Sequence, residues 1–145
     1  MRRLLPLLVA LLVTVSCGEM TTEAKEEVEE KKVEKKTMPA VQLNDGERWE
    51  ANAATAEGIE NLTEMVESFD PSRQSYDTLQ SELRDEFRLI FKNCTMKGEA
   101  HEQLHNYLLP LIELFGKLTL KDREKALAEI KEHLARFDTY FVADA

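Results

Sequence analysis

Apolar residues recur at intervals of three and four from Glu47 onward, the spacing that places side chains on one face of an α-helix. No segment alternates as a strand would, so the pattern predicts helices only. Because each narrow apolar face can be buried only against the others, we expect an all-α, up-down-up-down four-helix bundle over residues 47–145. The apolar positions of the four expected helices are Trp49, Ala53, Ala56, Leu62, Val66 and Phe69; Tyr76, Leu79, Leu83, Phe87, Ile90 and Phe91; Leu104, Leu108, Leu111, Ile112 and Phe115; and Leu120, Leu127, Ile130, Leu134, Phe137 and Phe141.

Helix-breaking residues separate these segments. Asp70 and Pro71 are suited to the cap and first position of the second helix. The string "CTMKG" (94–98) interrupts the pattern between the second and third helices. Pro110 lies inside the third helix and removes one backbone donor there, so we expect a kink.

The N-terminus has the features of a secretory signal. Arg2 and Arg3 precede an apolar run that ends at Val15, which is too short to be a convincing membrane-spanning helix. The following "TVSC" resembles the lipobox of bacterial lipoproteins. This resemblance implies that residues 1–16 are removed and that Cys17 carries the lipid. An ordinary signal peptide with a chance cysteine is the alternative.

Residues 17–46 form the second part of the chain, a solvated linker that we expect to be disordered. It is rich in Glu and Lys, carries no apolar face that could dock on the bundle, and ends at an Asn-Asp-Gly turn signal. The net charge of the chain is −9 and becomes −11 when the two arginines of the signal are removed. Such a charge disfavours nucleic acid as a partner but not cations. The protein is expected in the cell envelope, lipid-anchored to a membrane and facing the periplasm or the cell exterior.

Four potential ligands for a soft metal ion lie within twelve positions: Cys94, Met96, His101 and His105. The two histidines are separated by about 40° around a helix axis, so they are expected on one inward face, one turn apart. Thiolate and thioether donors favour copper, and Cu(I) above all. Zinc held by Cys94, both histidines and a carboxylate is the alternative. If Cys17 is acylated, Cys94 has no disulfide partner in the same chain, although a disulfide between two chains stays open.

The expected topology brings other residues to the same end of the bundle. Trp49 and Asn52 are expected on one side of the ligands, and Asn52 or Glu47 could orient a histidine from outside the coordination sphere. Phe137 and Phe141 are expected to form an aromatic wall on the other side. His133 lies beside the apolar face of the last helix and is expected to be exposed.

The strings "CTMKGEAHEQLHNYLLP" and "GERWEANAATAEGI" resemble small helical bacterial lipoproteins linked to copper handling. This resemblance implies a role in copper buffering, delivery or sensing for Cys94, Met96, His101 and His105, and a metal-donor or metal-acceptor protein as a partner. The sequence has no glycine-rich phosphate loop and no haem-attachment motif. We therefore expect a binding protein rather than an enzyme. The alternative is a structural or interaction module that presents an acidic face to another protein.

Overall fold

The computed structural model of the chain describes residues 39–144, and these are mostly helical. The all-α class expected from the sequence is confirmed in this respect. The expected signal peptide, the lipidated Cys17 and most of the linker lie outside the described residues. The elements in chain order are β1 (Trp49–Ala51), α1 (Ala53–Glu67), α2 (Tyr76–Asn93), α3 (Gly98–Lys117), α4 (Arg123–Leu134), α5 (Phe137–Tyr140) and β2 (Phe141–Ala143).

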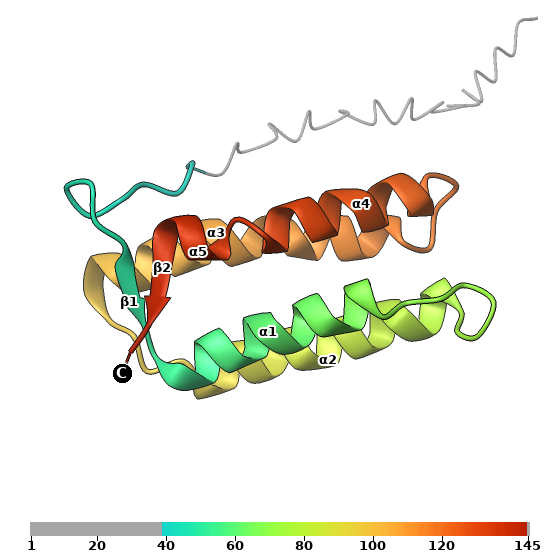
Figure 1. The fold of residues 1–145 in the computed structure, drawn as a ribbon, viewed down its shortest axis with the longest axis horizontal. Coiled ribbons are helices and arrows are strands. Elements are labelled where there is room, and N and C mark those ends of the chain that lie inside the picture. The colour runs from blue at the N-terminus through green and yellow to red at the C-terminus, as the bar shows by residue number, and fades with distance from the viewer. Residues whose placement is uncertain (1–38, 145) are drawn as a thin grey trace, which may run out of the picture. The chain divides into compact units, whose positions relative to one another are not determined.

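The long helices lie alongside one another, with α1 beside α2 and α3 beside α4 (Figure 1). Their apolar faces meet in one core, which includes Leu62, Leu83, Leu108 and Ile130, all fully buried. The helices α1 and α2 approach each other closely at Gly58, where an added Cβ atom would lie only 2.3 Å from Cγ1 of Ile90. The missing side chain at Gly58 therefore allows these two helices to pack closely.

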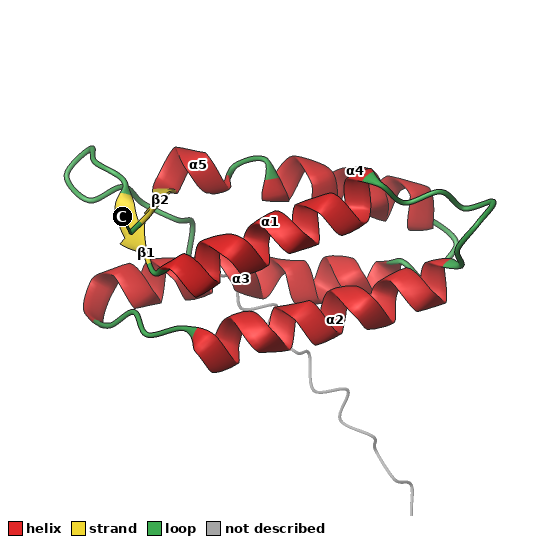
Figure 2. Ribbon diagram, turned by 60° about the horizontal axis from the view of Figure 1, so that its bottom comes forward, coloured by secondary structure: helices red, strands yellow, loops and turns green. Residues whose placement is uncertain are grey.

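Two short strands lie where the sequence predicted only helix. β1 and β2 form a parallel pair with Trp49 opposite Phe141 and Ala51 opposite Ala143 (Figure 2). The expectation of a helix beginning at Glu47 was therefore wrong, because the backbone of Trp49–Ala51 pairs with the end of the chain instead. The strands clamp the entry to α1 onto the C-terminal segment.

The start of α2 also differs from the prediction. The helix begins at Tyr76, and its N-cap is Ser75, whose hydroxyl accepts a hydrogen bond from the backbone N–H of Thr78. Asp70 instead accepts from the N–H of Ser72 and stabilises a turn before the helix. Pro71 lies in that turn, so Asp70 and Pro71 belong to the connection between α1 and α2 and do not begin a helix.

Three apolar residues expected in the core are exposed: Ala53 at the start of α1, Ile112 on α3 and Leu120 in the connection before α4. Leu120 precedes the first residue of α4 and therefore has no helical face to share. The helix α3 is continuous from Gly98 to Lys117 with Pro110 inside it. None of the helices in residues 39–144 is long and apolar enough to cross a membrane.

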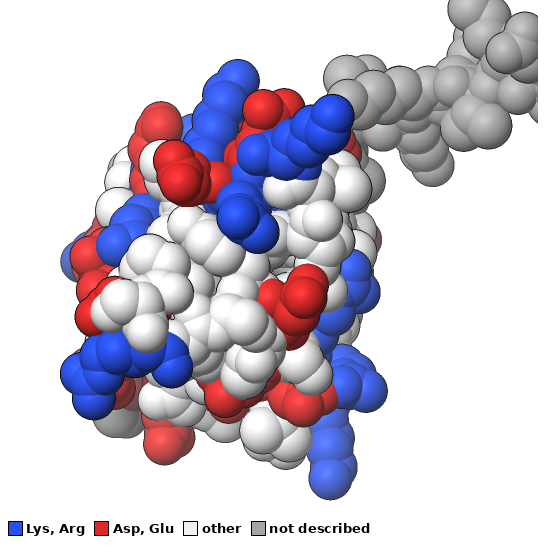
Figure 3. All heavy atoms as spheres, turned by 90° about the vertical axis from the view of Figure 1, so that its right-hand side faces the viewer, with Lys and Arg blue, Asp and Glu red and all other residues white. Residues whose placement is uncertain are grey.

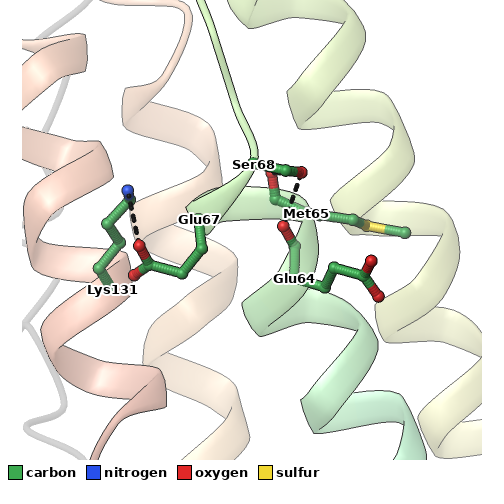
Figure 4. A network of polar contacts seen from close by, with 5 residues as sticks. All are labelled: Glu64, Met65, Glu67, Ser68 and Lys131. Carbon is green, nitrogen blue, oxygen red and sulfur yellow. Dashed lines mark hydrogen bonds and ion pairs between the residues drawn. The ribbon is translucent and has the colours of Figure 1, made fainter.

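Polar contacts close the end of α1 away from the strands. The backbone N–H and the hydroxyl of Ser68 both donate to the carbonyl of Glu64, and the Lys131 ammonium on α4 pairs with the Glu67 carboxylate at 3.2 Å (Figure 4). Such exposed pairs contribute about 0–1 kcal/mol. Figure 3 shows this end of the molecule, where basic and acidic side chains are interleaved rather than gathered by sign.

Candidate functional site

The candidate site lies where α2 ends and α3 begins. Cys94 is the C-terminal cap of α2, and only three residues separate it from Gly98, the first residue of α3. Gly98 has a φ of 62°, a conformation that is costly for residues with a Cβ atom. The chain therefore reverses sharply here, which carries the first turns of α3 back past the Cys94 side chain.

This reversal brings the thiol against the first histidine. Sγ of Cys94 lies 3.6 Å from Nδ1 of His101, so either the thiol donates to the ring nitrogen or the ring N–H donates to sulfur. The His101 and His105 rings lie one turn apart with their centroids separated by 4.3 Å. Cys94, His101 and His105 thus form a continuous chain of contacts, as their spacing in the sequence predicted.

The two histidines lie at the edge of the core rather than inside it. Both are half-buried, whereas Leu104 and Leu108 between and after them are fully buried. The reason is geometric: His101 and His105 occupy the side of α3 that meets α2, where the His105 ring packs edge-on against Phe91 at 5.2 Å. The expectation of histidines facing the bundle interior was therefore only partly correct.

The remaining residues named from the sequence have different surroundings. Met96 lies in the same loop, two residues after Cys94, and packs half-buried against the core. Trp49 is buried in β1 and donates its indole N–H to the carbonyl of Gln42. Glu47 is exposed and forms a two-residue bridge with Asn44. The indole hydrogen bond of Trp49 and the backbone bridge of Glu47 both lie within the segment before α1, and neither residue bonds to a histidine.

Asn52 acts on the thiol side of the site rather than on a histidine. Its side-chain amide donates to the carbonyl of Asn93 at 3.3 Å, and its amide oxygen accepts from the N–H of Thr95 at 3.4 Å. These two backbone groups flank Cys94. The Thr55 hydroxyl donates to the same amide oxygen at 2.7 Å and fixes its direction. Asn52 therefore holds the loop that carries the thiol.

The expected aromatic wall is formed by a different residue. Phe137 and Phe141 stack on each other and pack against Tyr107 rather than beside the histidine pair. The ring that covers the site is Phe91, which was assigned only to the core of the second helix. Its position three residues before Cys94 gave no local signal, since its role depends on how α2 and α3 meet.

The third histidine is not exposed, contrary to the expectation. His133 is half-buried, and its Nε2 lies 2.7 Å from the carbonyl oxygen of Tyr107, while Nδ1 lies 3.1 Å from Nη2 of Arg136. The hydroxyl of Tyr107 donates back to the carbonyls of His133 and Leu134. His133 therefore joins α4 to α3 as a structural residue.

Electrostatics favour the neutral imidazole form of His105 and of His133. Burial lowers the pKa of His105, and the charge of His101 lowers it further. Burial is also the main cause of the lowered pKa of His133. Neutral imidazole is the form that binds a metal ion. Within the described part of the chain, no group of three or more His, Cys, Asp and Glu side chains is arranged to hold a metal ion.

Comparison with protein-family models, with curated proteins and with solved structures finds no match to this chain.

Proposed function

We propose that the protein is a lipid-anchored, extracytoplasmic metal-binding protein that carries copper for buffering, delivery or sensing. The observation that supports this function most directly is the 3.6 Å contact between Sγ of Cys94 and Nδ1 of His101. The site is held by helices that we propose to alternate in direction as an up-down-up-down bundle. The short connections and the adjacency of α1 to α2 and of α3 to α4 support that arrangement.

The distance between the two donor atoms suits a shared metal ion. Sulfur and nitrogen ligands lie about 2.3 Å and about 2.0–2.1 Å from a zinc ion, so at a tetrahedral angle the two donors would be about 3.6 Å apart. At a trigonal angle, the separation with the same bond lengths would rise to about 3.8 Å. The Cys94–His101 pair therefore needs little or no movement to replace its shared proton with a metal ion.

The donor types favour Cu(I) over zinc. Thiolate and thioether sulfur are soft ligands that select Cu(I), which accepts two or three donors, whereas structural zinc takes four. Cys94 and His101 supply the first two donors, and the neighbouring His105 ring can turn to supply a third. Met96, in the same loop, is the candidate for a weak additional donor. A zinc site would need a carboxylate brought in as well.

The anchor and location rest on the N-terminal sequence. The lipobox-like "TVSC" supports acylation of Cys17 and hence attachment to a membrane in the cell envelope. A site of half-buried ligands at a helix connection is suited to exchange with a protein that donates or accepts the ion, because the ligands can be approached from solvent. We propose no catalytic role.

The test is a Cu(I) titration of the mature chain from Gly18 against a chromophoric chelator, under reducing and oxygen-free conditions. We expect one equivalent to be withheld by the wild type, and Cys94→Ser, His101→Ala and His105→Ala each to weaken binding. Met96→Leu is compared with Met65→Leu, a methionine on α1 that packs half-buried against the core. If none of the three ligand variants changes the affinity, the proposed function is wrong.

A second candidate function is supported by a groove between α1 and the C-terminal segment. The groove has a volume of about 830 Å³ and combines an apolar floor with four carboxylates. Ile59, Leu134 and Phe137 lie along its floor, and the carboxylates are Glu57, Glu60, Glu64 and Asp138. This is the acidic face that an interaction module would present to a basic partner. Glu57→Lys with Glu60→Lys should abolish capture of such a partner in crosslinked cells while leaving Cu(I) binding unchanged.

A further inference from the structure

A second groove, unrelated to the acidic one, opens between α2 and α3. It has a volume of about 530 Å³, within the range of about 300–1,000 Å³ typical of small-molecule sites. Its lining is apolar except for two arginines: Arg84, Phe87, Arg88 and Phe91 come from α2, and Leu109, Ile112 and Phe115 come from α3. The α2 residues are spaced at intervals of one, three and four along the sequence, so they lie on one face of the helix and form one continuous wall.

The bottom of the groove consists of aromatic rings that pack against one another. The Phe87 ring lies 5.0 Å from the Phe91 ring and meets the Phe115 ring edge-on at 5.7 Å. Phe87 and Phe115 are buried, whereas Ile112 on the opposite wall is 42% exposed. An aliphatic chain lying here would cover Ile112 and remove apolar surface from water, which stabilises a complex.

The two arginines differ in what they already bind. The Arg88 guanidinium pairs with the Asp85 carboxylate on the same helix. No carboxylate among the described residues pairs with the Arg84 guanidinium, and its Nη2 lies 3.9 Å from the point that a Cβ on Gly116 would occupy. Arg84 therefore reaches from α2 across to α3, over a position where α3 has no side chain, and places an unpaired cation at one end of the groove.

We propose that this groove binds an anionic amphiphile with a single aliphatic chain, a medium-chain carboxylate. The tail lies along Phe87, Phe91 and Ile112, and the carboxylate accepts hydrogen bonds from the Arg84 guanidinium, whose planar fork matches a carboxylate. Phe91 lies seven positions after Arg84, a distance of about 10 Å along a helix. A chain of medium length spans it, and a polar head at the Arg84 end remains in contact with water.

The charges around the groove favour this ligand over a cationic one. Both ionisable residues that line it are arginines, and the acidic residues of α1 line the other groove. The proposal does not depend on metal binding, because Cys94 and the histidines do not line the groove. The two proposals can therefore fail separately.

The test is calorimetric titration of the full mature chain with decanoate below its micelle concentration, accompanied by amide NMR shifts that locate the ligand. We expect binding by the wild type, shifts confined to α2 and α3, and no binding of decyltrimethylammonium, which has the same tail and the opposite charge. Arg84→Gln should weaken decanoate binding by about tenfold, the loss expected for one charged hydrogen bond. Arg73→Gln, at an exposed arginine in the connection before α2, should bind as the wild type does.

Ile112→Glu tests the apolar wall at an exposed position where the fold should survive, which circular dichroism checks. It should abolish decanoate binding, whereas Cys94→Ser should leave it unchanged. Equal binding of the cationic amphiphile, shifts that map to α1 and α4, or an unchanged affinity in Arg84→Gln would overturn the proposal. A wild type that binds an acidic amphipathic peptide but not decanoate would make the groove a protein-docking surface and would also overturn it.

Discussion

The histidines of this protein occupy two contrasting environments. Both ring nitrogens of His133 are engaged by protein groups, the carbonyl of Tyr107 and the guanidinium of Arg136. His101 instead contacts the Cys94 thiol, whereas His105 packs against the rings of His101 and Phe91 and has no hydrogen-bond partner among the described residues. The difference shows that burial alone does not separate a structural histidine from a candidate ligand. What separates them is the kind of partner: both nitrogens of His133 are held by a backbone carbonyl and a guanidinium, whereas the His101 nitrogen faces a thiol and His105 has no hydrogen bond among the described residues.

The hydrogen-bond partners of His133 also determine which of its two ring nitrogens carries the hydrogen. Arg136 can only donate, so Nδ1 accepts and Nε2 carries the hydrogen that it donates to Tyr107. The His133 ring is therefore neutral, and both of its nitrogens are engaged in hydrogen bonds. At the other site, the ring nitrogen of His101 faces a thiol sulfur, a donor type that binds soft metal ions, and we propose that one ion replaces the shared proton.

The largest expected contrast is in metal affinity. Cys94→Ser should lower the affinity for Cu(I) by more than about a hundredfold. Mutating a residue that only supports a ligand commonly lowers metal affinity tenfold to a hundredfold, and loss of a ligand itself should cost more. His133→Gln should leave the affinity unchanged. Competition against a chromophoric chelator measures both, and a similar loss in the two variants would remove the distinction between the two environments.

For the stability of the fold, we expect the opposite order: the contacts around His133 should matter more than the His101–His105 pair. Tyr107→Phe removes the hydroxyl that donates to the carbonyls of His133 and Leu134, and should lower the free energy of unfolding by about 1–3 kcal/mol. His105→Asn should cost less than about 0.5 kcal/mol, as is usual for substitutions near the surface. Urea unfolding followed by circular dichroism measures both. A larger loss in His105→Asn would show that the histidine pair is the structural one.

Asn52 tests whether the thiol side of the candidate metal site depends on support from α1. Asn52→Ala should free the loop around Cys94 and weaken Cu(I) binding by about tenfold, the effect of losing a residue that positions a ligand. Asn61→Ala is a matched control on the same helix, where the side-chain amide donates to Glu86 instead. If the two variants bind copper equally well, the hydrogen bonds of Asn52 do not position the thiol.

The smallest expected effect is in the pH dependence of stability. The pKa of His133 in the folded chain lies below its unfolded value of about 6.5, so the unfolded chain takes up a proton first as the pH falls. Neutral His133 therefore contributes fully to the free energy of unfolding above the unfolded pKa. This contribution is lost as the pH falls from the unfolded pKa to the folded pKa. His133→Gln should therefore flatten the decline in stability between pH 7 and pH 5. Thermal midpoints of both proteins across that range provide the measurement, and parallel curves would contradict the assignment.

The sequence predicted the parts of the molecule that depend on local spacing. Three-and-four periodicity placed the apolar face of α2 correctly, although the cap residues expected for this helix were wrong, and the same rule put His101 and His105 one turn apart. The short "CTMKG" segment requires the chain to reverse direction between α2 and α3. A reversal this short brings Cys94, which precedes α3, close to the first turns of that helix. The Cys94–His101 contact follows from these features.

Features that depend on distant partners could not be predicted in the same way. The pairing of Trp49 with Phe141 joins three-residue strands from the two ends of the described chain, which have no local signature. The burial of His133 arises because α4 packs on the Tyr107 carbonyl of α3. Asn52 was expected near the site, but its bonds to the loop backbone depend on the angle at which α1 meets the end of α2.

The most direct test of the proposed copper site is X-ray absorption spectroscopy of the protein loaded with one equivalent of Cu(I). We expect sulfur and imidazole nitrogen bound to the same copper ion in a monomer, with the sulfur contribution lost in Cys94→Ser and unchanged in His133→Gln. A copper ion bound only by nitrogen and oxygen, or a sulfur contribution that survives Cys94→Ser, would contradict a site built on Cys94 and His101.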